Sequence, residues 1–267
     1  MASSTTTKPR PGGIQRVVIY SLLLREIQTR FGKYRLGYFW AFLEPALHVT
    51  VFFLIFMFIK QKQVAGMSTP MLLVTGILPF FLFRYIIMSG MTAITGNLQI
   101  FNYRRVKPAD AVIARILLEV LTFGTVFVCF LIILWYFGFE VTVHNPVETF
   151  GVFALLILFS AGIAFALSIV GVLYPEMAKL IPMVIRPLYF ISGVFYTASF
   201  FPPDLRKYVL WNPLLHVTEL LRGAMLDTFE SYGSWLFLSI CTVISLFFGL
   251  SYHRINRIKI LTSVNRP

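Results

Sequence analysis

The stretch MLLVTGILPFFLFRYIIMSGMTA, residues Met71–Ala93, decides the fold class of this chain. It contains a single charged side chain, Arg84. An α-helix needs about 20 mostly apolar residues to cross the hydrocarbon core of a bilayer, and this stretch is long enough. The short alternating segments of a transmembrane β-barrel are missing from it, so it predicts a membrane-spanning helix.

Five further stretches of the same character lie on either side of this one. They are Gly37–Ile59, Ala111–Phe137, Phe150–Leu173, Leu180–Phe201 and Ser234–Tyr252. Hydrophobic residues make up 58% of the whole chain and charged residues only 13%, whereas a soluble domain has about 45–50% and about 25%. We therefore predict an all-α polytopic membrane protein with six transmembrane helices, and exclude an ordinary soluble enzyme and a disordered chain.

The distribution of basic residues predicts the orientation. Lys and Arg gather before the first predicted span and after the second, fourth and sixth, so both termini are expected in the cytoplasm. The net charge of +12 then reports membrane topology, and no nucleic-acid partner is expected. Residues 1–35 form a cytoplasmic N-terminus, 36–254 a single transmembrane domain and 255–267 a cytoplasmic tail. No apolar h-region opens the sequence, so we expect no cleavable signal peptide.

An amphipathic segment, Ile14–Phe31, precedes the first span. Its apolar residues recur at helical spacing and form one stripe: Val17, Tyr20, Leu24, Ile27 and Phe31. We expect a helix lying in the cytoplasmic membrane surface, with its arginines at lipid phosphates. The alternative is a helix that serves only as a topology anchor.

Two connections between spans have patterns of their own. Asn97–Pro108, after the second span, predicts either a plain loop or a short helix that docks into a cytoplasmic partner. Pro202–Gly233 is too long for a structureless loop. Within it, Asn212 predicts a helix N-cap and Pro213 the first helical residue. Two short helices that dip into the outer leaflet fit this segment, and an amphipathic surface cap is the alternative.

Two charges fall near mid-membrane in neighbouring antiparallel spans, Arg84 and Glu119. A lone charge at that depth is costly, so we predict an Arg84–Glu119 ion pair. Arg115, four residues before Glu119, is the competing partner. A structural ion pair is favoured over a proton relay.

The sequence contains no catalytic, nucleotide or metal motif. The Gly32-Lys33 pair is followed by Tyr34, so it is no phosphate-binding loop. The two cysteines indicate neither a zinc site nor a disulfide framework. We expect no enzyme activity from this chain alone, and we interpret His48 and His216 as satisfied structural residues.

Two groups of residues resemble signatures of a known family. The first resembles the N-terminal signature of polysaccharide-export ABC transporter permeases: Arg25-Glu26, Thr29-Arg30-Phe31-Gly32-Lys33, Leu36-Gly37-Tyr38, Trp40 and Glu44-Pro45. The second resembles the C-terminal ABC-2 signature: Gly193, Pro202, Trp211-Asn212-Pro213-Leu214, His216, Glu219 and Arg222-Gly223. The chain is thus identified as a member of the ABC-2 type permeases, most similar to capsular polysaccharide exporters of Gram-negative bacteria.

This resemblance implies an ABC-2, type V exporter-like fold and a function. Such a permease lies in the bacterial inner membrane as a homodimer and binds two ATPase subunits, which hold ATP and Mg. It exports a lipid-linked polysaccharide, together with periplasmic and outer-membrane export proteins. An interfacial helix before span one, a coupling helix after span two and two re-entrant helices between spans five and six are implied. They fall on the three segments set apart above.

The resemblance also implies roles for particular residues. The lipid end of the substrate would meet Arg30, Lys33 and Arg35. Coupling to the ATPase would use Asn102, Tyr103, Arg104 and Arg105. The re-entrant motif would be Trp211, Asn212, Pro213, His216, Glu219 and Arg222. The channel lining would be Tyr189, Tyr196, Phe52 and Phe56, because Tyr189 and Tyr196 are seven residues apart and would share one helix face.

Three alternative functions are weighed against this one. Another ABC-2 exporter could carry O-antigen, a different cell-surface glycan or a small drug. An ion-coupled secondary transporter would need inverted-repeat symmetry and midplane carboxylate clusters, and neither is seen in the sequence. A membrane glycosyltransferase would need catalytic carboxylates and a nucleotide-sugar domain.

We predict that the purified chain, free of any partner, hydrolyses no ATP, because it lacks a phosphate-binding loop. Phosphate release should stay at the level of a mock purification. Nucleotide turnover that copurifies with the chain through successive columns, and exceeds that level, would contradict the prediction.

Overall fold

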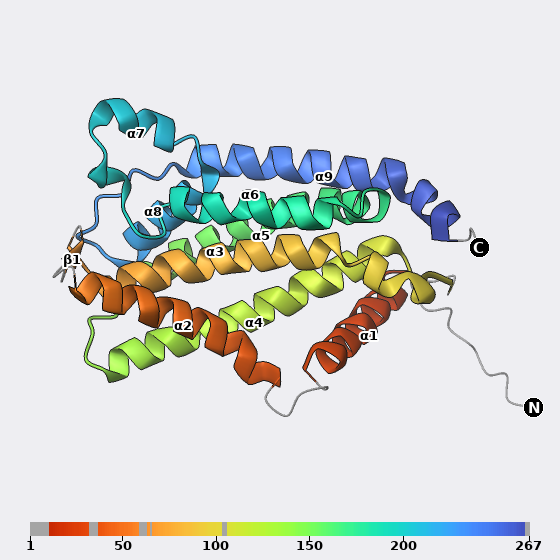
Figure 1. The fold of residues 1–267 in the computed structure, drawn as a ribbon, viewed down its shortest axis with the longest axis horizontal. Helices are drawn as coiled ribbons and strands as arrows, with labels where there is room; N and C mark the ends of the chain where they lie inside the picture. Colours follow the sequence, from red (N-terminus) through yellow and green to blue (C-terminus); the bar gives the residue numbers. More distant parts are fainter. Residues whose placement is uncertain (1–10, 32–36, 59–62, 65, 103–105, 265–267) are drawn as a thin grey trace, which may run out of the picture.

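The computed structural model describes residues 11–31, 37–58, 63–64, 66–102 and 106–264, and most of them are helical (Figure 1). Helices are expected because they satisfy their own backbone groups where no water is present. The α-helices are α1 (Pro11–Phe31), α2 (Gly37–Phe58), α3 (Thr69–Met91), α4 (Pro108–Tyr136), α5 (Pro146–Leu173), α6 (Met177–Ile191), α7 (Pro203–Val209), α8 (Pro213–Met225) and α9 (Trp235–Val264).

Three smaller elements complete the described part of the chain. Two 3₁₀ helices, η1 (Thr95–Asn102) and η2 (Ala198–Phe200), follow α3 and α6. Between α2 and α3, β1 (Gln63–Val64) pairs antiparallel with β2 (Met67–Ser68) around the turn at Gly66. This two-residue hairpin is the one departure from the predicted all-α chain among the described residues.

Four described helices are long and apolar enough to cross a membrane: α3, α4, α5 and the part of α9 from Trp235 to Arg257. They match the second, third, fourth and sixth predicted spans. The first predicted span coincides with α2, a helix of 22 residues whose apolar part runs over Phe42–Phe58. The fifth predicted span is shorter than expected, because α6 has only 15 residues, with Pro182 and Pro187 inside it.

The predicted span Leu180–Phe201 was wrong in its extent, because the helix ends at Ile191. Gly193 follows in the left-handed region, with φ of 70°, where glycine meets no steric penalty. A Cβ at this position would also lie 2.3 Å from Leu215 Cδ1 of α8. The chain therefore turns here and returns through η2, α7 and α8.

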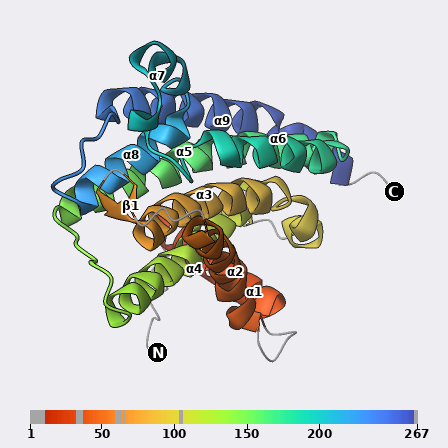
Figure 2. The ribbon, with the colours of Figure 1, turned by 60° about the vertical axis from the view of Figure 1, so that its left-hand side comes forward.

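The centre of the molecule is α3, which packs against α2, α4, α5 and α8. Figures 1 and 2 show it lying between α4 on one side and the layer of α5, α6 and α9 on the other. Its side chains are buried almost throughout, and Leu72, Leu73, Ile77 and Ile86 have no exposed surface. This burial on all faces explains why its sequence shows no polar stripe.

Helices α5 and α9 pack most extensively, and they do so through glycines. A Cβ on Gly249 of α9 would lie 1.9 Å from the carbonyl oxygen of Gly162 in α5, and a Cβ on Gly162 would lie 2.4 Å from Ser245. Small residues at a helix crossing allow backbones to approach closely, which is a main source of helix association in lipid. The two helices therefore meet backbone to backbone.

Helix α1 confirms the predicted helix over Ile14–Phe31. The first part of its apolar stripe faces away from the protein, since Val17 and Tyr20 are 64% and 61% exposed. The opposite side packs against α4 and buries Leu22. In Figure 1, α1 and η1 lie toward the same end of the molecule as the last turns of α9, and α7 lies at the other end.

We predict that Gly249→Ala lowers the free energy of unfolding by about 1–3 kcal/mol, because the added methyl group overpacks the α5–α9 contact. Gly124→Ala on α4 is the matched control, since a Cβ there meets nothing within 4 Å. The control should leave stability unchanged or raise it by up to about 1 kcal/mol. Unfolding of the purified variants in detergent measures both effects, and equal behaviour of the two variants would refute the close contact.

Candidate functional site

Helix α8 brings together the residues of the predicted re-entrant motif. Asn212 caps it as predicted, because its side-chain oxygen accepts a hydrogen bond of 3.0 Å from the Leu214 N–H, and Pro213 occupies the first turn. Its apolar residues Leu214, Val217, Leu221 and Met225 are buried. Trp211, directly before the cap, is exposed. The Asn212-Pro213 pair thus sets the start of α8.

Arg222 on α8 is a completely buried cation. Its guanidinium donates to the carbonyl oxygens of Gly193 at 2.8 Å, Tyr196 at 2.8 Å and Val194 at 3.3 Å, all in the turn after α6. It also donates to α3, at Leu72 O (3.2 Å) and Thr75 Oγ1 (3.3 Å). One side chain therefore supplies donors to carbonyls that the end of a helix leaves unpaired.

Glu219 and His216 form hydrogen bonds from α8 to the backbone of the segments before and after it. Glu219 Oε1 accepts from the Ala198 N–H at 2.9 Å, and Oε2 accepts from the Tyr232 N–H at 3.2 Å. His216 Nδ1 accepts from the Ser234 N–H at 2.8 Å, while Nε2 donates to Leu210 O at 2.7 Å. His216 is thus a satisfied structural residue, as predicted, and these side chains are anchors with no free reactive group.

Tyr189 of α6 lies at the centre of an aromatic cluster. Its ring centroid is 4.9 Å from that of Phe80, 5.2 Å from Phe195 and 6.5 Å from Phe52. The Phe52 and Phe195 rings are 4.2 Å apart. Phe56, another of the predicted lining residues, is partly buried against the core. The structure therefore brings Tyr189 and Phe52 together.

Tyr196 does not share a helix face with Tyr189, so that prediction was wrong. Helix α6 ends at Ile191, and the spacing of seven residues crosses the turn at Gly193. The Tyr196 hydroxyl donates to Ile191 O at 2.6 Å, and its ring packs against Phe201. Its position follows from the turn that Arg222 holds.

A cavity of about 470 Å³ opens beside Tyr189, between α2, α3 and α6. Aromatic rings form much of its wall: Phe52, Phe80, Phe81, Tyr189 and Phe190. Charged and polar side chains reach it from all three helices: Glu44, His48, Arg84 and Arg186. It combines apolar ring faces with hydrogen-bonding groups, which is the usual lining of a small-molecule site.

The predicted Arg84–Glu119 ion pair is not formed. Glu119 is 1% exposed and accepts from Arg30 Nη1 of α1 at 2.6 Å, while Arg84 Nη1 lies 3.5 Å from Glu44 Oε1 of α2. Glu44 also accepts from the Tyr85 hydroxyl. Equal depth in two spans does not fix which faces meet, and α1 and α2 supply the nearer partners.

A polar network joins α1 to η1 and α4. Glu26 Oε1 accepts from Arg115 Nε of α4 at 3.0 Å and from Asn97 Nδ2 of η1 at 2.9 Å. Arg25 Nη1 donates to Asn97 Oδ1 at 2.9 Å. Arg115, the predicted competitor for Glu119, thus pairs with Glu26. The arginines Arg25 and Arg30 bind protein side chains, which differs from the expected contact with lipid phosphates.

Asn97 and Glu26 are central to this network, and neither was predicted as a site residue. Two sequence signals lay close to them: Asn97 begins the segment after span two, and Glu26 belongs to the N-terminal signature. Of the predicted coupling residues, Asn102 is the last residue of η1, and Tyr103, Arg104 and Arg105 lie outside the described residues. Lys33 and Arg35 of the predicted lipid-binding set also lie outside them.

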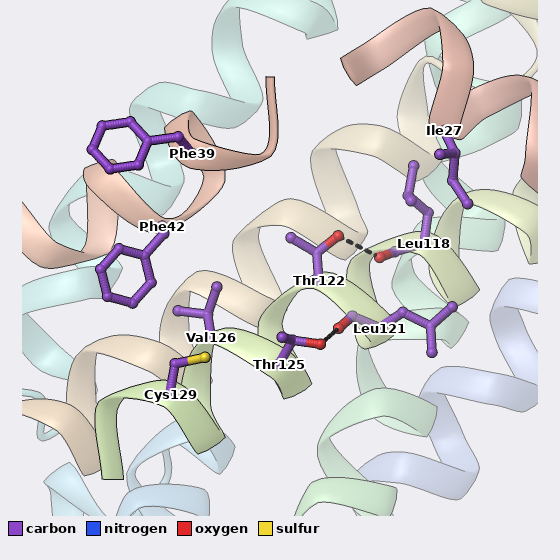
Figure 3. Close-up of a pocket in the computed structure, with 9 residues that line it drawn as sticks. All are labelled: Ile27, Phe39, Phe42, Leu118, Leu121, Thr122, Thr125, Val126 and Cys129. Atoms are coloured by element: carbon purple, nitrogen blue, oxygen red, sulfur yellow. Dashed lines mark hydrogen bonds between the residues drawn. The ribbon is translucent and has the colours of Figure 1, made fainter. Parts of the chain in front are cut away.

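An apolar pocket of about 580 Å³ lies between α1, α2 and α4. Figure 3 shows Phe39 and Phe42 of α2 on one side and Ile27 of α1 on the other, with residues of α4 between them. The hydroxyls of Thr122 and Thr125 donate to the backbone of α4, so their hydrogens are not available to a ligand. Such a pocket suits a hydrocarbon chain. Within the described residues, no group of three or more His, Cys, Asp or Glu could hold a metal ion.

Comparison with known proteins gives the family of the chain. Residues 17–226 match the model of the family described as ABC-2 type transporter. The polysialic acid transport protein KpsM of Escherichia coli is 41% identical over 94% of this chain and 97% of its own length. The capsule polysaccharide export inner-membrane proteins CtrC of Neisseria meningitidis and BexB of Haemophilus influenzae are 29% and 28% identical. They match over 89% and 92% of this chain and 90% and 93% of their own lengths.

We predict that a double-mutant cycle on Arg30→Gln and Glu119→Gln gives a coupling energy of about 1 kcal/mol or more, because each change leaves the other partner without its ion pair. The matched cycle on Arg84→Gln and Glu119→Gln should be additive within about 0.5 kcal/mol. Unfolding of the three single variants, the two double variants and the wild type in mixed micelles measures both. A larger coupling for Arg84 than for Arg30 would overturn the pairing.

Proposed function

Because the chain belongs to the ABC-2 type transporter family, we propose that it is the membrane subunit of an ATP-driven capsular polysaccharide exporter. The observation that carries this is 41% identity to a polysialic acid transport protein over 94% of the chain. Two copies form the channel in the bacterial inner membrane, with both termini in the cytoplasm. A separate ATPase chain supplies the energy and holds ATP and Mg.

In this proposal α2 and α6 serve as the first and fifth of six membrane helices, and α7 and α8 form the re-entrant pair. Support for α2 comes from the apolar helix Phe42–Phe58. Support for the re-entrant pair comes from Glu219 and Arg222 of α8, which are buried and hydrogen-bond to the backbone of the segment after α6. Non-helical backbone at membrane depth is stable only when protein groups satisfy it. Arg222 and Glu219 provide these hydrogen-bond partners, Arg222 for carbonyl oxygens and Glu219 for N–H groups.

The ATPase acts on η1 and the residues that follow it, up to Pro108. The hydrogen bonds of Asn97 with Arg25 and Glu26 give a direct path from η1 to α1, and the Glu26–Arg115 pair extends it to α4. When ATP binding moves η1, α1 moves with it. The two-state element biased by ATP is therefore the position of α1 against α4.

The substrate carries a lipid, and α1 is where that lipid arrives. The apolar pocket between α1, α2 and α4 accommodates a hydrocarbon chain. Arg30, Lys33 and Arg35 attract the anionic group that joins lipid to sugar. The sugar chain then passes along aromatic faces that include Tyr189 and Phe52, on which sugar C–H surfaces stack without fixing one register. Periplasmic and outer-membrane proteins receive the chain.

We predict that the complex of this chain and its ATPase, in liposomes, moves lipid-linked polysaccharide when ATP is present. Reversing both charges with Arg104→Glu and Arg105→Glu should abolish transport or ATPase binding, because the segment that contacts the ATPase loses two of its three cations. The matched control reverses Arg254 and Arg257, two exposed arginines near the C-terminal end of α9, and should retain most of the activity.

The assay separates this function from its rivals. Transport driven by an ion gradient without the ATPase would assign the chain to another transporter class. Export of O-antigen or of a small drug, with no movement of capsular polysaccharide, would keep the family and change the cargo. Normal export by the Arg104 and Arg105 double variant would remove those residues from coupling.

A further inference from the structure

The cavity beside Tyr189 holds an unbalanced positive charge. Its walls carry one carboxylate, Glu44, and two guanidiniums, Arg84 and Arg186. The Arg84–Glu44 pair is long, at 3.5 Å, and Glu44 is shared with the Tyr85 hydroxyl. Arg186 is exposed and makes no ion pair or hydrogen bond with any described residue. A guanidinium has five N–H donors, so those of Arg186 are open to a ligand.

The depth of this charge makes it unusual. Arg84 lies well inside α3, a membrane-spanning helix, and Arg186 lies between the two prolines of α6. Cations within membrane segments are costly, and they persist where they face a water-filled cavity or bind a partner of opposite charge. The described residues around the cavity supply no second carboxylate. An anion that enters from outside the chain would complete the balance.

A second observation, independent of charge, points into the same cavity. Tyr189 is only 9% exposed, and its hydroxyl has no hydrogen-bond partner among the described residues. Its ring is enclosed by Phe52, Phe80 and Phe195. Buried polar groups are normally paired, so an orphaned hydroxyl at a cavity wall indicates a group that the ligand or its water supplies.

The geometry identifies the chemical class of that ligand. Guanidinium groups bind carboxylates through paired, charge-assisted hydrogen bonds. The phenol hydroxyl of Tyr189 can bond a sugar hydroxyl, and the aromatic walls can stack against sugar C–H surfaces. A neutral sugar would satisfy the rings and leave the cation unbalanced. We propose that the cavity between α2, α3 and α6 binds the carboxylate of an acidic sugar unit through Arg186 and Arg84, with Tyr189 bonding the same unit.

The consequence is selectivity, and it rests on the proposed export function. A channel with this site passes polymers whose sugars carry carboxylates and discriminates against neutral ones, because only an acidic sugar neutralises Arg186. A lipid phosphate offers similar chemistry, but the cavity is reached by side chains from the interior of α2, α3 and α6 and not from the surface helix α1. We commit to the sugar carboxylate.

The test compares one oligosaccharide with its uncharged counterpart. Short oligomers of sialic acid, and the same oligomers with each carboxylate reduced to an alcohol, are titrated onto the full exporter complex in phosphatidylcholine nanodiscs. Saturation-transfer NMR measures binding. Arg186→Gln should weaken binding of the acidic oligomer about tenfold or more, because it loses a charge-assisted bond. The reduced oligomer should bind weakly, and equally, to both proteins.

Two further variants make the result specific. Lys179→Gln removes an exposed cation from the same helix away from the cavity, and should bind the acidic oligomer as the wild type does. Tyr189→Phe keeps the ring and deletes the orphaned hydroxyl, so it should fold with unchanged thermal stability and bind the acidic oligomer more weakly. This variant decides the matter if Arg186→Gln fails to fold.

Three outcomes would overturn the site: equal affinity for both oligomers, unchanged binding by Arg186→Gln and Tyr189→Phe, or full displacement of the acidic oligomer by phosphatidylglycerol added to the nanodiscs. A transport assay separates this failure from failure of the export function. ATP-driven movement of acidic and reduced polymers at the same rate would keep the exporter and reject the site. No ATP-driven movement of any polymer would reject the export function itself.

Discussion

A backbone that leaves its helix in the interior of a protein must find hydrogen-bond partners there, and this requirement organises the α6–α8 region. Helix α6 stops at Ile191, so the carbonyls after it cannot bond along a helix. Arg222 supplies the missing donors and ties the turn to α3 at Leu72 and Thr75. A neutral side chain has too few donors for this, and lysine lacks the planar fork that reaches several acceptors at once.

The charge of Arg222 is balanced within one turn of α8. Glu219 lies three residues earlier and also binds only backbone N–H groups, those of Ala198 and Tyr232. The two side chains thus pair with complementary backbone groups: Arg222 donates to carbonyl oxygens, and Glu219 accepts from N–H groups. Because both side chains are buried and hydrogen-bonded, they fix the position of α8 between α3, α5 and α9.

Local signals made much of this fold predictable. Helix α1, four of the spans and the Asn212-Pro213 start of α8 follow from periodicity, length and capping, which depend on neighbours in the sequence. The family follows from two clusters of residues. The prediction of an Arg84–Glu119 ion pair was wrong because a residue's position along its span gives only the depth of its side chain. It does not give the direction in which the side chain points from the helix. The prediction that Tyr196 shares a helix face with Tyr189 was wrong because a seven-residue spacing places two residues on one face only where the helix continues. Here the turn at Gly193 interrupts it. No local pattern shows that Arg30 and Glu44 lie closer to those charges, since these contacts join residues far apart in the chain.

The backbone contact between Gly162 and Gly249 has a mechanical meaning. At this contact no side chain separates α5 from α9, so sliding one helix along the other would drive carbonyl oxygens into Cα atoms. These two helices therefore form a rigid frame. By contrast, α2 contains Pro45 and α6 contains Pro182 and Pro187, each of which removes a helix hydrogen bond and permits bending. The cavity between α2, α3 and α6 can therefore change its width while α5 and α9 keep their positions relative to each other.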